Sequence, residues 1–225
     1  MTTSQRQRIY IAEPDIDRRE KRRVMSVLES GDLADGEEVR SFEDEFADYC
    51  GVSHGVATAN GTAALHAALA ALDIGEGDRV LTTPFSFVAT ANAIRLAGAE
   101  PVFADIDPAT YNIDPDAAEE VIREHDGDVD AILVVHLYGL PVQLDRFRDL
   151  ADTYDAALVE DCAQAHGAEY CGKRVGSFGD AAAFSFYPTK NMTTGEGGMV
   201  VTDRADVAER GASFVNHGRA PDDGS

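Results

Sequence analysis

Two segments of this sequence carry residues that could act together on one ligand. Lys190 lies in the segment 184–198, which is rich in glycine, and Asp161 ends an apolar stretch 29 positions before it. A lysine amine can form a Schiff base with an aldehyde, and a buried carboxylate can keep a pyridine nitrogen protonated so that the ring accepts electrons. Pyridoxal phosphate (PLP) chemistry needs this pair. A lysine beside glycines is by itself more often a solvated surface residue, so the other motifs must show whether Lys190 belongs to a binding site.

A glycine turn at 59–66 could bind a phosphate group. Asn60, Gly61 and Thr62 precede an alanine-rich stretch that is typical of a helix. Free amides at a helix N-terminus bind phosphate, Thr62 could add a hydroxyl, and Ser185 could donate another. The same pattern also fits an ordinary helix N-cap, so this motif is weak when it stands alone.

Aromatic and polar side chains follow two of the apolar stretches. Phe85 or Phe87 could stack on a planar ring, although either residue could equally belong to the core. A buried Asp161 needs a cationic or hydrogen-bonding partner, which a pyridinium nitrogen would supply. Gln164 or His166 could hydrogen-bond a phenolic oxygen on the same ring. The competing interpretation is that Asp161 caps the next helix.

The elements that must position these residues alternate between short apolar strands and helical segments. We expect strands at 79–82, 101–104, 131–135, 156–159, 181–186 and 199–202. Continuous apolar strands separated by helices are typical of a mostly parallel sheet with helices on both faces. Ligands collect at the carboxyl ends of such strands, which is where Phe87, His136 and Asp161 fall. The predicted fold class is therefore α/β.

Two amphipathic helices precede this alternation. Apolar residues at helical spacing predict one helix over about 15–28, and Ser30-Gly31 is its stop signal. A second helix is predicted over 38–49, with Val39, Phe42, Phe46 and Tyr49 on one face. We therefore divide the chain into an N-terminal helical segment, 1–30, and a large domain, 31–225.

The composition excludes several classes of protein. An apolar content of 44% excludes a disordered chain. The 41 acidic and 19 basic residues give a formal net charge of −22, and the acidic residues are spread along the chain. This pattern favours the solvated anionic surface of a halophilic protein working in high salt. It argues against nucleic acid and acidic membranes as partners.

The sequence also predicts a cytoplasmic protein. No window holds about 18 consecutive apolar residues, and residues 1–8 have no apolar core behind them as a signal peptide would. Cys50, Cys162 and Cys171 are an odd number without CxxC spacing, so neither a disulfide framework nor a zinc site is suggested. We expect a reducing compartment and no metal ion.

Taken together, the motifs make the chain similar to one known family. It resembles the DegT/DnrJ/EryC1/StrS family of PLP-dependent sugar aminotransferases over about residues 9–217. The segments that carry the resemblance are Ser30-Gly31, Phe42-Glu43, Asn60-Gly61-Thr62, Asp105-Ile106-Asp107, His136-Leu137-Tyr138-Gly139, 160–167 and 184–198. The resemblance implies the large domain of a fold type I PLP-dependent transferase.

The resemblance also implies a role for each site residue. Lys190 would be the Schiff-base lysine and the acid/base that moves a proton, and Asp161 would pair with the pyridine nitrogen. Phe87 would stack on the ring, and Gln164 would lie near the phenolic oxygen. Thr62, Ala63 and Ser185 would hold the phosphate, with Gly61 in the same turn. Relatives that carry histidine instead of the lysine perform dehydration, and Lys190 argues against that branch.

The implied reaction moves an amino group in two halves. An amino acid, usually glutamate, leaves its amine on PLP, which then aminates a keto group on a nucleotide-linked sugar, as in polysaccharide biosynthesis. Members of the family are homodimers with a small C-terminal domain, which this chain would lack. The alternative is a truncated, non-catalytic PLP-binding or regulatory protein of the same fold.

Overall fold

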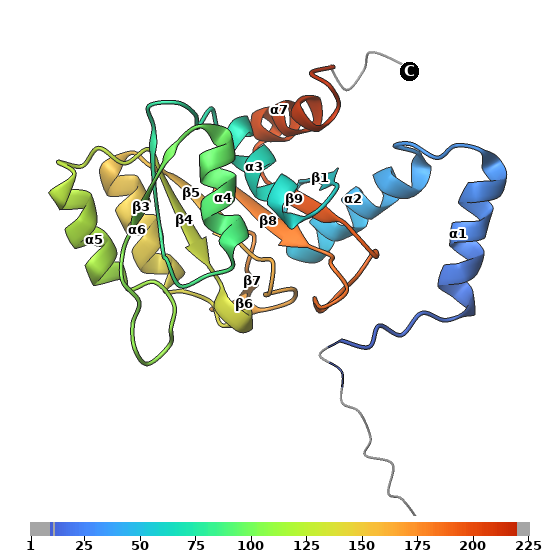
Figure 1. The fold of residues 1–225 in the computed structure, drawn as a ribbon, viewed down its shortest axis with the longest axis horizontal. Helices are drawn as coiled ribbons and strands as arrows, with labels where there is room; N and C mark the ends of the chain where they lie inside the picture. Colours follow the sequence, from blue (N-terminus) through green and yellow to red (C-terminus); the bar gives the residue numbers. More distant parts are fainter. Residues whose placement is uncertain (1–9, 11, 220–225) are drawn as a thin grey trace, which may run out of the picture.

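A seven-stranded sheet forms the centre of the molecule (Figure 1). The computed structural model describes residue 10 and residues 12–219. In the order β1-β9-β8-β5-β4-β2-β3, the strands are β1 (His54–Thr58), β9 (Gly198–Thr202), β8 (Ala181–Ser185), β5 (Ala157–Asp161), β4 (Ala131–Val135), β2 (Arg79–Thr82) and β3 (Glu100–Phe103). β9 pairs antiparallel with both of its neighbours, whereas the pairs from β8 to β3 are parallel. The mostly parallel sheet is therefore confirmed.

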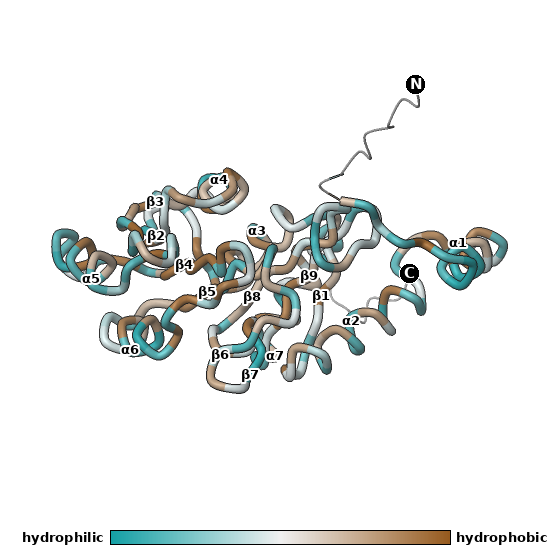
Figure 2. Tube along the Cα trace, turned by 90° about the horizontal axis from the view of Figure 1, so that it is seen from below, coloured by the Kyte–Doolittle hydropathy of each residue, from teal (hydrophilic) through white to brown (hydrophobic). Residues whose placement is uncertain are grey.

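Helices cover both faces of this sheet, as the alternation of apolar stretches predicted (Figure 2). One buried cluster joins the sheet to α2 (Glu37–Cys50), α5 (Pro115–Glu124) and α6 (Leu144–Tyr154). A second joins the opposite face to α3 (Gly61–Ala71), α4 (Val88–Ala97) and α7 (Ala205–Val215). In β4, Ile132 belongs to the first cluster and Leu133 to the second, as expected where successive side chains of a strand point to opposite faces.

Four strands differ from the sequence expectation by more than one residue. β1 was not predicted. β5 runs two residues further than expected, so Glu160 and Asp161 belong to the strand itself and their side chains point to opposite faces. A short hairpin of β6 (Glu169–Tyr170) and β7 (Lys173–Arg174) stands apart from the main sheet.

The N-terminal helix α1 (Arg18–Ser30) begins and ends with standard capping contacts. The Asp17 carboxylate accepts from the Arg19 amide, while the Glu20 carboxylate accepts from the Asp17 amide. Gly31 ends the helix in the left-handed conformation, which confirms the predicted stop. No residue of α1 is buried. The domain boundary at residue 30 stays a prediction.

Within residues 12–219 no helix is long and apolar enough to cross a membrane.

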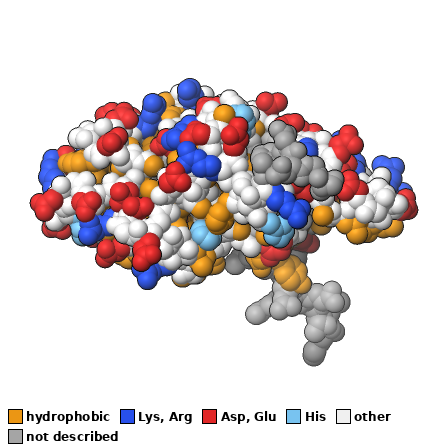
Figure 3. Space-filling model, turned by 90° about the horizontal axis from the view of Figure 1, so that it is seen from above, with side chains coloured by type: hydrophobic (Ala, Val, Ile, Leu, Met, Phe, Trp, Pro, Cys, Tyr) orange, Lys and Arg blue, Asp and Glu red, His pale blue; other side chains and the backbone are white. Residues whose placement is uncertain are grey.

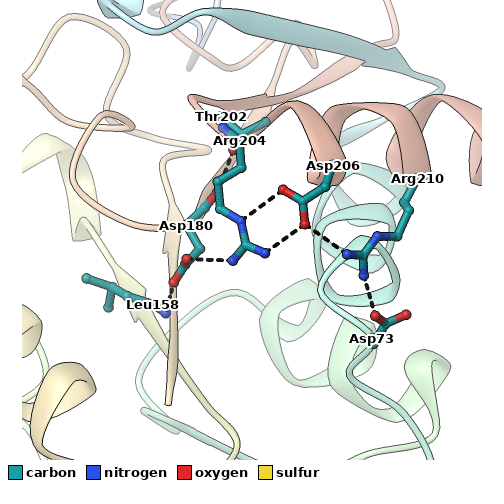
Figure 4. Close-up of polar contacts among 7 residues, drawn as sticks. All are labelled: Asp73, Leu158, Asp180, Thr202, Arg204, Asp206 and Arg210. Atoms are coloured by element: carbon teal, nitrogen blue, oxygen red, sulfur yellow. Dashed lines mark hydrogen bonds and ion pairs between the residues drawn. The ribbon is translucent and has the colours of Figure 1, made fainter. Parts of the chain in front are cut away.

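An ion-pair network attaches α7 to the rest of the fold (Figure 4). Arg204, at the N-cap of α7, donates to Asp180 over 2.9 Å and holds Asp206 through two bonds of 2.8 and 3.2 Å. Arg210 joins the same Asp206 at 2.8 Å and also pairs with Asp73, just beyond α3. Single exposed ion pairs contribute little, but this network links three segments. Elsewhere on the surface, Figure 3 shows acidic side chains spread over one face rather than gathered in a patch.

Candidate active site

A cavity of about 820 Å³ lies where β5 and β8 end and where α3 and α4 begin. All eight residues that the sequence nominates for the cofactor site line this cavity: Gly61, Thr62, Ala63, Phe87, Asp161, Gln164, Ser185 and Lys190. The cavity therefore lies at the carboxyl edge of the parallel strands, where α/β sheets bind their ligands. The roles of the eight residues stay predictions.

The start of α3 lies directly against the end of β8. A Cβ atom on Gly61 would come within 2.6 Å of the Ser185 Cβ, so only glycine allows this approach. Asn60 is the N-cap, and its side chain accepts a hydrogen bond from the Ala63 amide over 2.9 Å. The N-cap interpretation is therefore correct for Asn60, and the Ala63 amide is already engaged. Within the described chain, the amides of Gly61 and Thr62 have no acceptor and remain available for an anion.

Asp161 is a buried carboxylate at the floor of the cavity. Its Oδ2 accepts from the Thr90 hydroxyl over 2.8 Å, and its Oδ1 accepts from the Ala163 amide over 3.1 Å. Burial raises the pKa of Asp161, while these hydrogen bonds and the charge of Lys190 oppose the rise. These groups therefore compensate the cost of burying the charge only in part, so a cationic ligand could bind to this carboxylate.

Lys190 reaches the same cavity from the loop between β8 and β9. Its side chain is half-buried, and burial lowers the pKa of its amine, with the charge of Asp161 acting in the opposite direction. A lowered pKa increases the fraction of neutral amine, which is the nucleophilic form. The Lys190 amide donates to the Tyr187 carbonyl over 2.8 Å, so a tight turn holds this part of the loop.

Of the two candidate stacking residues, only Phe87 lines the cavity. It is the N-cap residue of α4, and 68% of its surface is exposed. Phe85 instead packs against Tyr111, with the ring centroids 5.7 Å apart. Neither phenylalanine is a core residue, because Phe85 is also 48% exposed.

Of the two candidate donors to a ring oxygen, only Gln164 lines the cavity. Its Oε1 accepts from the Tyr138 amide over 2.9 Å, which leaves the Nε2 amino group as a donor without a partner among the described residues. His166 does not line the cavity and lies among the rings of Phe184 and Phe186. Burial lowers the pKa of His166 to about 4, so its ring is neutral at pH 7.

His136, the other residue placed at a strand end, points away from the cavity. Its Nε2 lies 3.0 Å from a Glu160 oxygen, and its Nδ1 accepts from the Val142 amide over 3.2 Å. Glu160 also accepts from three backbone amides at 176, 178 and 179. Burial alone would raise the pKa of Glu160, but these bonds outweigh it and the pKa is lowered. Cys162 completes a buried trio of metal-ligand types, but the ring nitrogens of His136 and the carboxylate of Glu160 already have hydrogen-bond partners within the protein.

Sequence reasoning missed Thr90 and Ser86. Thr90 is completely buried in α4, and its hydroxyl also lies 2.8 Å from the Ser86 hydroxyl, which lines the cavity. The available signal was weak, because Ser86 precedes α4 and a spacing of four brings two side chains together reliably only inside a helix.

Comparison with known proteins identifies the family to which this chain is similar. The profile of the DegT/DnrJ/EryC1/StrS aminotransferase family matches residues 14–225. GDP-perosamine synthase from Caulobacter vibrioides is 40% identical over 95% of this chain and 57% of its own length. UDP-N-acetyl-3-dehydro-α-D-glucosamine 3-aminotransferase from Acidithiobacillus ferrooxidans is 44% identical over 87% of this chain and 52% of its own length.

A solved structure gives the same result. Helicobacter pylori PseC, an aminotransferase involved in the biosynthesis of pseudoaminic acid, superposes with a TM-score of 0.89 and 35% identity. The alignment covers 95% of this chain and 57% of PseC, so the chain spans about half the length of the curated relatives it matches. Aminotransferases of this group depend on PLP. The chain belongs to the DegT/DnrJ/EryC1/StrS aminotransferase family.

Proposed function

We propose that this chain forms the PLP-binding part of an aminotransferase that moves an amino group from an amino acid, with glutamate as the expected donor, to a keto group of a nucleotide-linked sugar. The observation that carries the proposal is the meeting of Lys190 and Asp161 in one cavity. The names of the relatives from Caulobacter vibrioides and Acidithiobacillus ferrooxidans, a GDP-sugar and a UDP-sugar enzyme, support the substrate class.

The residues of the cavity fit PLP. Two amides at the start of α3 that have no acceptor among the described residues, together with the adjacent Ser185 hydroxyl, suit its phosphate. The buried Asp161 suits its pyridinium nitrogen, and Phe87 offers an aromatic face. Gln164 offers the Nε2 donor for the phenolic oxygen. Lys190 supplies the amine that binds the aldehyde.

Each residue would then have a distinct task in the reaction. Bound PLP supplies an electron sink for the carbon that gains or loses the amino group. Asp161 keeps the ring nitrogen protonated, so electrons are drawn towards the ring. Lys190 would bind the aldehyde of the cofactor and, once free, its amine would carry a proton to and from the substrate carbon. The first residues of α3 and Ser185 hold the phosphate, and with it the ring, in one orientation.

A trapping experiment tests cofactor binding. The chain is incubated with PLP and treated with borohydride, which fixes the cofactor to any lysine that has bound it, and the modified peptide is found by mass spectrometry. We expect modification at Lys190, with no modification in Lys190→Ala. Lys173→Ala, which removes an exposed lysine on β7, is the matched control and should behave like the unmodified chain. Trapping at other lysines without Lys190 would refute the proposal.

Adding glutamate before the borohydride tests transamination. A transaminase half-reaction frees Lys190 and leaves the amine on the cofactor, so trapping at Lys190 should disappear. The alternative, a non-catalytic PLP-binding protein, predicts that trapping persists. Retention of both Lys190 and Asp161 favours the aminotransferase.

We also propose a homodimer working in a cytoplasm of high salt. Support for the dimer comes from the apolar side chains exposed around the cavity, including Phe87, Leu96 and Tyr187. Support for the salt-rich environment comes from the net charge of −22, because salt screens the repulsion between acidic groups. Light scattering should give twice the chain mass, and the melting temperature should rise with KCl. A monomer, or a melting temperature that falls with KCl, would contradict the respective proposal.

A further inference from the structure

Two hydroxyl groups connect the buried end of Asp161 to the open cavity. The Thr90 Oγ1 lies 2.8 Å from Asp161 Oδ2 and 2.8 Å from Ser86 Oγ. Thr90 is completely buried, whereas Ser86 lines the cavity. Both residues belong to the segment that carries Phe87, the N-cap of α4. The bend before α4 and the first turn of α4 therefore present the aromatic face and also contact the carboxylate.

The direction of these hydrogen bonds follows from counting protons. An ionised carboxylate can only accept, so Thr90 must donate its single hydroxyl proton to Asp161. Thr90 can then only accept from Ser86, whose proton points into the chain of bonds and not into the cavity. If Asp161 becomes protonated at Oδ2, both hydroxyls can rotate, and the order of donors reverses. Ser86 would then turn its proton towards the cavity.

We propose that Thr90 and Ser86 are positioning residues that form a relay to Asp161, holding its carboxylate ionised and oriented before any cofactor binds. The use of this relay depends on the proposed function, because a pyridinium nitrogen needs an ionised carboxylate as its partner. The bonds themselves exist within the protein and can be measured without the cofactor.

Charged and titratable groups from several elements surround Asp161. Lys190 approaches from the loop after β8, and His136 follows β4. Glu160 and Cys162 are its neighbours along the chain. Burial raises the pKa of Asp161, and the Thr90 hydroxyl is the first of the groups that oppose the rise. Removing this hydroxyl should therefore change the pKa of Asp161 more than removing any single distant charge would.

The test is the pKa of Asp161 in the cofactor-free chain, measured by carbon-13 NMR of labelled aspartate carboxyl groups and assigned with Asp161→Asn. Thr90→Val keeps the shape of the side chain but removes the hydroxyl, and it should raise the pKa by about one unit or more. Thr90→Ser retains a hydroxyl and should restore the value. Ser86→Ala should raise the pKa by a smaller amount, because it removes only the bond that polarises Thr90.

A matched control removes a buried hydroxyl elsewhere. Thr202 on β9 donates to the Asp180 carbonyl over 2.6 Å, and Thr202→Val should leave the pKa of Asp161 unchanged. An unchanged pKa in Thr90→Val, or equal shifts in Thr90→Val and Thr90→Ser, would overturn the relay. If Thr90→Val does not fold, the Ser86→Ala variant is used instead: a raised pKa of Asp161 supports the relay, and an unchanged pKa overturns it.

A second measurement separates this inference from the proposed function. PLP should bind more weakly to Thr90→Val than to the unmodified chain, and the difference should grow as the pH falls through the raised pKa of Asp161, because a smaller fraction of the carboxyl is then ionised. If the unmodified chain binds no PLP, the proposed function fails, while the NMR comparison still decides whether the relay acts on Asp161.

Discussion

Asp161 and Lys190 enter one cavity from neighbouring parallel strands, and burial shifts the pKa of each towards its neutral form. Asp161 is the last residue of β5, and Lys190 follows β8, which pairs with β5. Their mutual attraction does not cancel the cost of burial at either group. A cofactor that offers a cationic nitrogen to the acid and an aldehyde to the amine would relieve both groups.

Asp161→Asn should stabilise the cofactor-free chain near pH 7 and weaken PLP binding. A carboxyl whose pKa is raised in the folded state stabilises the fold at low pH, and this stabilisation is lost as the pH rises through the folded value. The amide carries no such charge, so urea unfolding should show less decline in stability with increasing pH. The dissociation constant of PLP should increase roughly 10- to 100-fold with the loss of a charge-assisted hydrogen bond. An unaltered pH dependence would contradict the burial argument.

His166→Phe should flatten the pH dependence of stability on the acid side. Burial lowers the pKa of His166 from 6.5 to about 4, so the unfolded chain takes up its proton first as the pH falls. Stability is therefore lost between those two values, by roughly 3 kcal/mol at the lower end. The phenylalanine ring suits the site because Phe46, Phe184 and Phe186 surround it.

The measurement for His166 is urea unfolding at a series of pH values between 7 and about 4. His217→Gln, at an exposed histidine, serves as the control and should keep the slope of the unmodified chain. The interpretation fails if His166→Phe retains the same slope.

Glu160→Gln should destabilise the chain by about 3–5 kcal/mol, because it places an amide NH₂ where one carboxylate accepts four hydrogen bonds. Three of these come from the backbone between 176 and 179 and the fourth from His136. Thermal or urea unfolding measures the loss. Glu169→Gln, on the exposed face of β6, is the control and should change stability by less than about 0.5 kcal/mol. Similar stabilities for both variants would rule out a structural role for Glu160.

Gly198→Ala should lower both stability and PLP affinity. A Cβ atom at this position would come within 2.5 Å of the Asn60 carbonyl oxygen, so β9 or the start of α3 must shift. Overpacking of this kind costs about 1–3 kcal/mol, and the shift would displace the amides proposed for the phosphate. Gly75→Ala, whose Cβ would make only an ordinary 3.6 Å contact, provides the comparison in unfolding and PLP titration. Equal PLP affinity in Gly198→Ala and the unmodified chain would show that the turn tolerates the shift.

The sequence patterns predicted the residues that line the cavity better than the residues that support them. Asp161 and Lys190 could be nominated because they occur together with a glycine turn and an aromatic in one α/β chain, although each residue alone has a commoner structural explanation. The opposite roles of Glu160 and Asp161 follow from strand alternation, but only once β5 is known to include both residues. Thr90 could not be found from composition, because a threonine inside a helix has no fixed partner. β1 was missed because its sequence, HGVAT, has no continuous apolar run.

The antiparallel direction of β9 has a consequence for engineering this scaffold. A parallel partner would require the chain to leave β8 through a crossover helix, whereas the antiparallel pairing lets residues 186–197 return directly across the cavity. Both ends of this connection are fixed in register, Ser185 opposite Gly198 and Phe184 opposite Met199. Residues between Tyr187 and Glu196 can therefore be varied in an engineered chain while Lys190 and the buried Phe186 are kept, because the two flanking strands hold both ends of the connection in place.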